Sequence, residues 1–132
     1  MNRPPSTVLL LGRLLVGALF LVAGLRKAMS IAPTAGHMAK NGVPMAEVLV
    51  YGAVLLEILG GLALILGWKT RAVAWVLAIF VIVITPIFHG FWTFPPEQFV
   101  GQLNHFLKNL AVIGGLFYIA SLGAGSISLD KK

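Results

Sequence analysis

The chain has 132 residues, of which 58% are hydrophobic and only 11% are charged, and its mean hydropathy is +0.94. Soluble domains carry about 25% charged residues, so this composition predicts an integral membrane protein. Because the chain contains no cysteine, disulfides, dithiol chemistry and thiolate-bound iron–sulfur clusters are excluded within it. The net charge of +6 comes from single or paired basic residues that mostly flank apolar runs, which indicates membrane anchoring rather than nucleic-acid binding.

Four apolar spans predict an all-α, integral membrane four-helix bundle that forms a single domain over residues 1–132. The expected helices cover residues 7–29, 46–67, 71–89 and 96–122. An alternative for the first span is a cleaved signal peptide, because Arg3 precedes it. Arg13 interrupts this span and no small-residue cleavage site follows, so we expect it to remain as the first helix.

The connections between the spans differ in length and composition. The first, from Ser30 to Ala46, is too long for a tight hairpin and ends in a turn sequence that includes Pro44. We expect Pro44 in the first turn of the second helix, where a proline is tolerated. A short turn follows the second helix, an aromatic segment from Gly90 to Pro95 follows the third, and Pro96 begins the fourth.

The distribution of basic residues predicts the orientation in the membrane. An even number of crossings places both termini on one side, and six of the ten basic residues fall on that side. These six are Arg3, Arg13, Lys69, Arg71, Lys131 and Lys132, against Arg26, Lys27, Lys40 and Lys108 on the other side. Since cytoplasmic loops carry more Lys and Arg, we expect a multi-pass protein of the bacterial inner membrane with cytoplasmic termini.

Glu57 is the candidate catalytic residue, because it is the only charged residue between Val48 and Trp68. A charge at that depth is unfavourable by roughly 2.5 kcal/mol or more, so it normally faces the bundle interior and finds a basic partner. We expect Arg13 or Lys108 to be that partner. Two roles stay open for Glu57, namely proton exchange with a ligand and a structural ion pair that fixes the helix register.

Helical spacing places further polar residues on inward faces. Arg13 and Lys27 lie on one glycine-lined stripe of the first helix, which we expect to form a charged inner seam. Polar residues near the third connection predict a vestibule at one membrane surface, with Glu57 as its floor. The candidate ligand-binding residues of this vestibule are His89, Trp92, His105, Lys108 and Asn109.

These candidates also have structural interpretations. The spacing of His89 and His105 matches no familiar metal motif, so no metal site is predicted and interfacial hydrogen bonding is the simpler role. Trp92 lies beside Phe91 and Phe94, a cluster that is typical of an aromatic anchor at the headgroup level as well as of a ligand platform.

Short motifs along nearly the whole chain carry a family resemblance. They include Arg13-Leu-Leu, Phe20-Leu-Val-Ala-Gly-Leu, Asn41-Gly-Val-Pro44, the run from Glu57 to Gly67, His89-Gly-Phe-Trp92 and Phe106-Leu-Lys-Asn109. Together they resemble the DoxX family of small four-helix bacterial membrane proteins. The resemblance implies a setting among membrane oxidoreductases that handle sulfur compounds or oxidative stress, since one relative is associated with thiosulfate:quinone oxidoreduction.

The leading hypothesis is a subunit or accessory of a membrane oxidoreductase system that forms a site for a quinone or a similar small amphipathic molecule. It implies no covalent cofactor, a quinone as ligand, and an oxidoreductase subunit as partner in the lipid bilayer, with a homo-oligomer as a further arrangement. The alternatives are a non-catalytic scaffold or assembly factor, and a small-solute carrier. The carrier is disfavoured because the chain shows no internal repeat.

Overall fold

The computed structural model describes residues 3–130, and every regular element in that range is helical. Lys131 and Lys132, which contribute to the predicted charge bias, lie outside the described residues. The four long helices are α1 (Ser6–Ala28), α3 (Ala46–Leu66), α4 (Thr70–His89) and α5 (Pro96–Leu122). Two shorter elements, α2 (Ile31–Lys40) and the 3₁₀ helix η1 (Phe91–Thr93), lie in the connections. The long helices match the four predicted spans to within one residue at each end.

The outer surface of the bundle is apolar. The four long helices are long and apolar enough to cross a bilayer. They expose large side chains to the outside, among them Leu15 at 74% and Tyr118 at 72%. Such a surface is stable only when lipid covers it. The predicted all-α membrane four-helix bundle is therefore confirmed.

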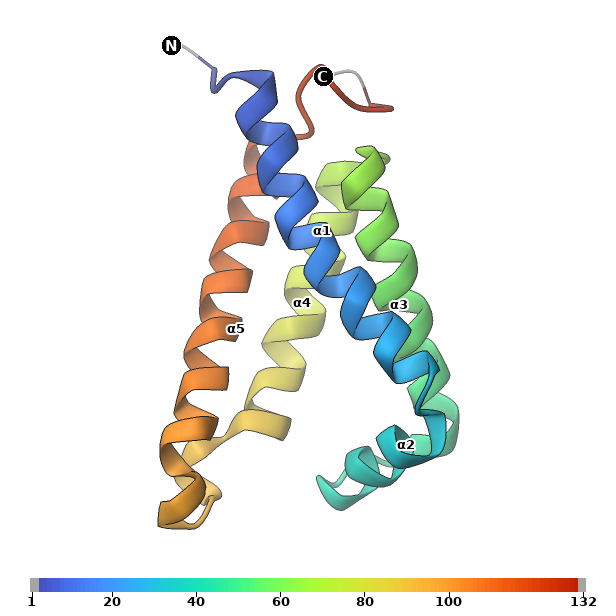
Figure 1. The fold of residues 1–132 in the computed structure, drawn as a ribbon, viewed down its shortest axis with the longest axis vertical. Coiled ribbons are helices and arrows are strands. Elements are labelled where there is room, and N and C mark those ends of the chain that lie inside the picture. Colours follow the sequence, from blue (N-terminus) through green and yellow to red (C-terminus); the bar gives the residue numbers. More distant parts are fainter. Residues whose placement is uncertain (1–2, 131–132) are drawn as a thin grey trace.

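The long helices associate as two pairs. Most contacts of α1 are with α3, and most contacts of α4 are with α5. Figure 1 shows the two pairs close together near the start of α1 and the end of α5, and further apart at the end that holds α2. In the first pair, glycines on both helices bring the backbones together, since a β-carbon on Gly61 would lie 2.7 Å from the Gly17 carbonyl oxygen.

The buried apolar core is concentrated at the end where the pairs meet. Its larger cluster includes Phe20, Leu64, Leu77 and Leu116, one residue from each long helix. A smaller cluster of Met38, Ala46 and Val50 lies at the other end, between α2 and α3. Packing therefore fills the bundle fully at one end only.

The segment after α5 folds back over the closely packed end. Ser126 is hydrogen-bonded through its hydroxyl to Ser6 at the start of α1, at 2.7 Å. Farther along, the Asp130 carboxylate accepts hydrogen bonds from the backbone N–H groups of Lys69 and Thr70, at 2.8 and 2.9 Å. These groups open α4, where the helix dipole also favours a negative charge. Residues 123–130 thus join the start of α1 to the start of α4.

The protonation of Asp130 is coupled to this contact. Its partial burial alone would raise the pKa of the carboxyl group. The hydrogen bonds from Thr70 and Lys69, together with the charge of Arg13, outweigh burial and hold the pKa of Asp130 below its usual range.

A further arginine closes the carboxyl end of α5. The Arg71 guanidinium, at the start of α4, donates to the carbonyl oxygens of Ala120 at 3.2 Å, of Ser121 and of Leu122 at 3.4 Å. These carbonyls have no partner within the helix, so a cation there satisfies them and opposes the helix dipole. The contact fastens α4 to α5 at the closely packed end.

The first connection contains a helix, α2, that is not among the predicted spans. Its residues Ile31, Ala35 and Met38 recur at intervals of four and three, and all three pack into the smaller core cluster. Pro33 does not prevent helix formation, because it lies in the first turn, where the N–H groups have no acceptor within the helix.

The prediction that Pro44 lies in the first turn of the second spanning helix is wrong. Helix α3 begins at Ala46, and Met45 before it adopts a left-handed conformation with φ of 53°. The reversal at Met45 keeps Pro44 outside the helix. Glu47 lies in the first turn of α3, where the helix dipole favours an acidic residue.

Candidate functional site

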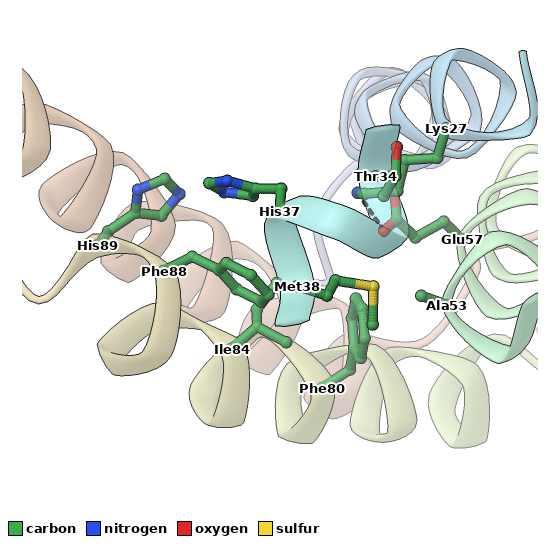
Figure 2. Close-up of a pocket in the computed structure, with 10 residues that line it drawn as sticks. All are labelled: Lys27, Thr34, His37, Met38, Ala53, Glu57, Phe80, Ile84, Phe88 and His89. Carbon is green, nitrogen blue, oxygen red and sulfur yellow. Dashed lines mark hydrogen bonds and ion pairs between the residues drawn. The ribbon is translucent and has the colours of Figure 1, made fainter. Parts of the chain in front are cut away.

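A cavity of about 220 Å³ lies where the two helix pairs diverge. Its lining comes from α1, α2, α3 and α4, and comprises Lys27, Thr34, His37, Met38, Ala53, Glu57, Phe80, Ile84, Phe88 and His89. Figure 2 shows Lys27, Thr34 and Glu57 grouped at one end, His89 at the other, and Phe80, Ile84 and Phe88 along one side. The cavity therefore offers polar groups at its ends and an apolar wall between them.

The polar end is built around an ion pair between α1 and α3. The Lys27 ammonium lies 2.5 Å from Oε1 of Glu57, whose side chain is only 2% exposed. The second carboxylate oxygen, Oε2, is also buried and has no hydrogen-bond partner within residues 3–130. Glu57 thus presents an acceptor that the folded chain itself leaves unused.

The partner of Glu57 is not one of the two that the sequence predicts. Lys27 takes this place because Gly24, one turn earlier on α1, lets the two helices approach closely. A β-carbon on Gly24 would lie 3.0 Å from the β-carbon of Glu57. The expectation of Arg13 or Lys108 as partner is wrong.

Arg13 lies on the same stripe of α1 but serves the opposite end of the bundle. It is buried, and it donates to the Leu64 carbonyl oxygen at 3.3 Å and to the Ile127 carbonyl oxygen at 2.5 Å. Arg13 therefore satisfies a carbonyl group near the end of α3 and attaches the segment after α5 to the bundle. The two residues of the predicted charged inner seam both face α3, but only Lys27 reaches the cavity.

His89 lines the cavity at the end of α4. Its Nδ1 atom lies 2.8 Å from Oε1 of Gln102 on α5, and its ring stacks on that of His105 with centroids 4.8 Å apart. His105 is exposed and does not line the cavity. The contacts on α5 fix the orientation of the His89 ring relative to the cavity.

The three remaining candidate ligand-binding residues lie away from the cavity. Asn109 is buried between α4 and α5, where its amide donates to the Thr85 hydroxyl at 3.1 Å. Lys108 is exposed, and Trp92 is 58% exposed with its ring edge-on to that of Phe91. The reason is that α5 turns Gln102 and Asn109 to α4, where they contact His89 and Thr85, so its polar face connects this helix pair.

Helix α2 supplies three lining residues that sequence reasoning missed. Thr34, His37 and Met38 follow one another at the spacing of one helical face, which is the signal that identifies them once the helix is recognised. His37 stacks on Phe88 with ring centroids 5.4 Å apart, so α2 is joined to α4 across the cavity.

A larger apolar groove of about 450 Å³ adjoins the cavity. The two share Met38, Ala53, Phe80, Ile84 and Phe88 as lining residues. The groove also includes Val83 and Ile87, which are exposed on the outer face of α4. The polar cavity is therefore bordered by an apolar path toward the lipid-facing surface.

This fold and cavity define a small multi-pass membrane protein with an ion pair in the lining of a cavity between its helices. A model of the DoxX family matches residues 8–90, and the chain belongs to this family. All ten cavity-lining residues fall inside the matched range. The polar face of α5 and residues 123–130 lie outside the matched range.

Named relatives support the same assignment. The inner membrane protein YqjF of Escherichia coli (strain K12) is 34% identical over 133 residues, covering 99% of this chain and 95% of YqjF. The inner membrane protein YphA of the same organism is 29% identical over 125 residues, covering 95% and 89%. A surfeit locus protein 4 homolog of Schizosaccharomyces pombe is 29% identical over 101 residues, 74% of this chain but 32% of that protein.

The relatives and the helices together give the location. The chain is a multi-pass protein of the bacterial inner membrane, as predicted. No solved structure matches it.

Proposed function

We propose that the chain is an accessory subunit of a membrane oxidoreductase and that its cavity holds the head group of a quinone or a similar small amphipathic molecule. The observation that carries the proposal is the combination of an ion pair and two histidines with an apolar wall in one cavity. Ligand sites of this kind are mostly apolar, with a few polar groups that orient the ligand.

The sizes of the two spaces suit such a ligand. Pockets for drug-sized molecules enclose about 300 to 1,000 Å³, so a cavity of about 220 Å³ fits a single substituted ring. The adjoining groove of about 450 Å³ is apolar and suits a hydrocarbon tail. A molecule dissolved in the bilayer would reach both through the outer face of α4.

The proposal assigns the electron transfer to a partner chain. This chain has no cysteine for dithiol chemistry, and its own contribution is to bind and orient the ring. Given the charge bias, we infer that both termini face the cytoplasm, so the cavity lies toward the periplasmic surface. Reporter fusions at the two ends would test this orientation.

The decisive experiment fills the cavity and measures its content. Ala53 lines both spaces, and Ala53→Phe adds a ring to them, whereas Leu55→Phe changes the lipid-facing side of the same helix and serves as control. Each protein is purified gently from its own membrane, and quinone per chain is measured by mass spectrometry. We expect near-stoichiometric quinone in the wild type and in Leu55→Phe, and at least a tenfold loss in Ala53→Phe.

Two results would overturn the proposal. One is a wild-type preparation without quinone, and the other is equal quinone content in both variants. Co-purifying polypeptides are identified in the same samples. A reproducible partner protein without any quinone would support the scaffold role instead, which the Lys27–Glu57 link between α1 and α3 favours on structural grounds.

A further inference from the structure

We propose that a pocket at the junction of α1 and α2 binds the phosphodiester head group of an anionic phospholipid, phosphatidylglycerol. The pocket has a volume of about 310 Å³ and lies at the end of the bundle that holds α2 (Figure 1). Its lining residues are Ala23, Arg26, Lys27, Ser30 and Thr34. Arg26 does not line the cavity described above, so this inference is tested apart from the proposed function.

The lining combines the end of one helix with the beginning of the next. Ala23, Arg26 and Lys27 stand at positions i, i+3 and i+4, so they share one face of the last turns of α1. Ser30 lies in the turn that follows, and Thr34 comes from the beginning of α2. Two cations and two hydroxyl groups therefore border one space.

Most hydrogen-bond donors of these side chains are unused by the folded chain. The side chains of Arg26, Ser30 and Thr34 make no hydrogen bond or ion pair with any other residue in the range 3–130. The Lys27 ammonium has three N–H donors and gives one of them to Glu57. Since a guanidinium carries five more donors, the pocket offers several N–H and O–H groups to one anion.

The net charge of the site matches a phosphodiester. Arg26 and Lys27 contribute two positive charges, and Glu57 neutralises one of them through its pair with Lys27. A phosphodiester carries one negative charge, whereas a phosphomonoester carries about −1.5 to −2 at pH 7. Among residues 3–130, no acidic side chain lines the pocket. The ammonium group of phosphatidylethanolamine would therefore lack a partner there, while the uncharged glycerol of phosphatidylglycerol needs none.

The surface of α1 next to the pocket suits the acyl chains of a lipid. Leu15, Leu19 and Val22 follow one another at intervals of four and three, and all three are exposed. Arg26 comes four residues later, so this apolar face leads to the pocket. Helix α1 has 23 residues and is about 35 Å long, close to the ~30 Å of a bilayer core, which places Arg26 in its last turn near the lipid phosphates. The apolar face adds contacts only for an anion that carries hydrocarbon chains, and it favours a lipid over a free anion.

Three probes test the site on the delipidated wild-type protein in a neutral detergent. They are phosphatidylglycerol, phosphatidylethanolamine with the same acyl chains, and inorganic phosphate. Retention of radiolabelled lipid on the immobilised protein gives the dissociation constants, and inorganic phosphate is added in excess as a competitor. We expect phosphatidylglycerol to bind at least about fivefold more tightly than phosphatidylethanolamine, and inorganic phosphate not to displace it.

A variant pair locates the site. Arg26→Gln should weaken the binding of phosphatidylglycerol by about 10- to 100-fold, the range of hydrogen bonds to a charged group. The control Lys40→Gln removes the same charge at the other end of α2, outside the pocket. In salt of about 0.15 M it should change the affinity by no more than about twofold, because charges beyond the screening length contribute little. Both residues are exposed, and melting temperatures establish that both variants fold.

Several results would overturn the inference. Equal affinities of the wild type for the two lipids would refute the selectivity, and equal losses in the two variants would reduce the effect to general surface charge. An unchanged affinity in folded Arg26→Gln would refute the pocket. Displacement of the lipid by inorganic phosphate would refute the lipid as occupant and indicate a free-anion site. Should Arg26→Gln not fold, the wild-type affinities and the competition decide alone.

Discussion

The closest approach between α1 and α3 gives a test of the packing that can be worked out in numbers. A β-carbon at Gly61 would lie 2.7 Å from the carbonyl oxygen of Gly17 and 2.7 Å from the backbone nitrogen of Leu21. Both are backbone atoms of α1, so no side-chain rotation can relieve the clash. Ordinary contact begins at 3.4 Å, and the helices must therefore separate from 2.7 to 3.4 Å, that is by about 0.7 Å.

The expected loss of stability follows from this displacement. Inserting an extra carbon into a well-packed contact costs about 1 to 3 kcal/mol. Replacing glycine by alanine in a helix also has an intrinsic benefit of up to about 1 kcal/mol, which would mask part of the loss. Gly52→Ala corrects for this benefit, because Gly52 lies on the same helix and a β-carbon there meets nothing within 4 Å. We expect Gly61→Ala to be less stable than Gly52→Ala by about 1 to 3 kcal/mol.

The assay is equilibrium unfolding in mixed micelles, followed by tryptophan fluorescence and by helical circular dichroism. The two variants are compared with each other and with the wild type under identical micelle composition. Free energies of unfolding that agree to within about 0.5 kcal/mol for both variants would refute the reasoning, since surface substitutions of no consequence differ by that much.

Two further predictions concern the closely packed end. Gly67 has φ of +72°, and a β-carbon there would lie 2.2 Å from Nη1 of Arg13. Gly67→Ala should therefore lower the free energy of unfolding by about 1 to 2 kcal/mol in the same assay. The control Gly12→Ala, with open space around it, should leave the free energy of unfolding unchanged. Asp130→Asn should lower the melting temperature at pH 7, because the pKa of Asp130 is lowered in the folded protein and its charge is part of the contact with α4. A group of this kind stabilises above its unfolded pKa of about 3.9, and the contribution is lost as pH falls through the lower folded pKa. Melting temperatures of wild type and Asp130→Asn should therefore converge below about pH 3.9, and a constant difference down to pH 3 would contradict the assignment.

The helices and the burial of Glu57 follow from the sequence for a simple physical reason. A bilayer requires apolar runs of a definite length, so the four spans can be read directly from composition. A lone carboxylate in such a run is stable only when it faces the bundle interior. The structure agrees on both points.

The partner of Glu57 could not be read in the same way. Spacing assigns Arg13 and Lys27 to one face of α1, but it does not say which of them lies opposite Glu57. That depends on the register of two antiparallel helices, which the contact between Gly17 and Gly61 sets. In this register Gly24 lies opposite Glu57, and Lys27, one turn farther along α1, reaches its carboxylate.

The lining of the cavity includes residues of α2, a helix that a search for long apolar runs does not find. Helix α2 is too short to span a membrane, and its contribution of His37 arises from its packing against Phe88. The polar residues of α5 show the converse error. Asn109 has the spacing of an inward-facing residue, yet the face it shares is turned to Thr85 on α4 and satisfied there.

The fastening of the bundle at one end has a mechanical consequence. Arg71 and Asp130 hold the helices together at one membrane surface, while the cavity lies toward the other. Helix α5 has 27 residues and is about 40 Å long, so a tilt of about 3° at the fastened end displaces its other end by about 2 Å. A small tilt of the α4–α5 pair at the fastened end thus produces a larger displacement at its opposite end, where the cavity lies.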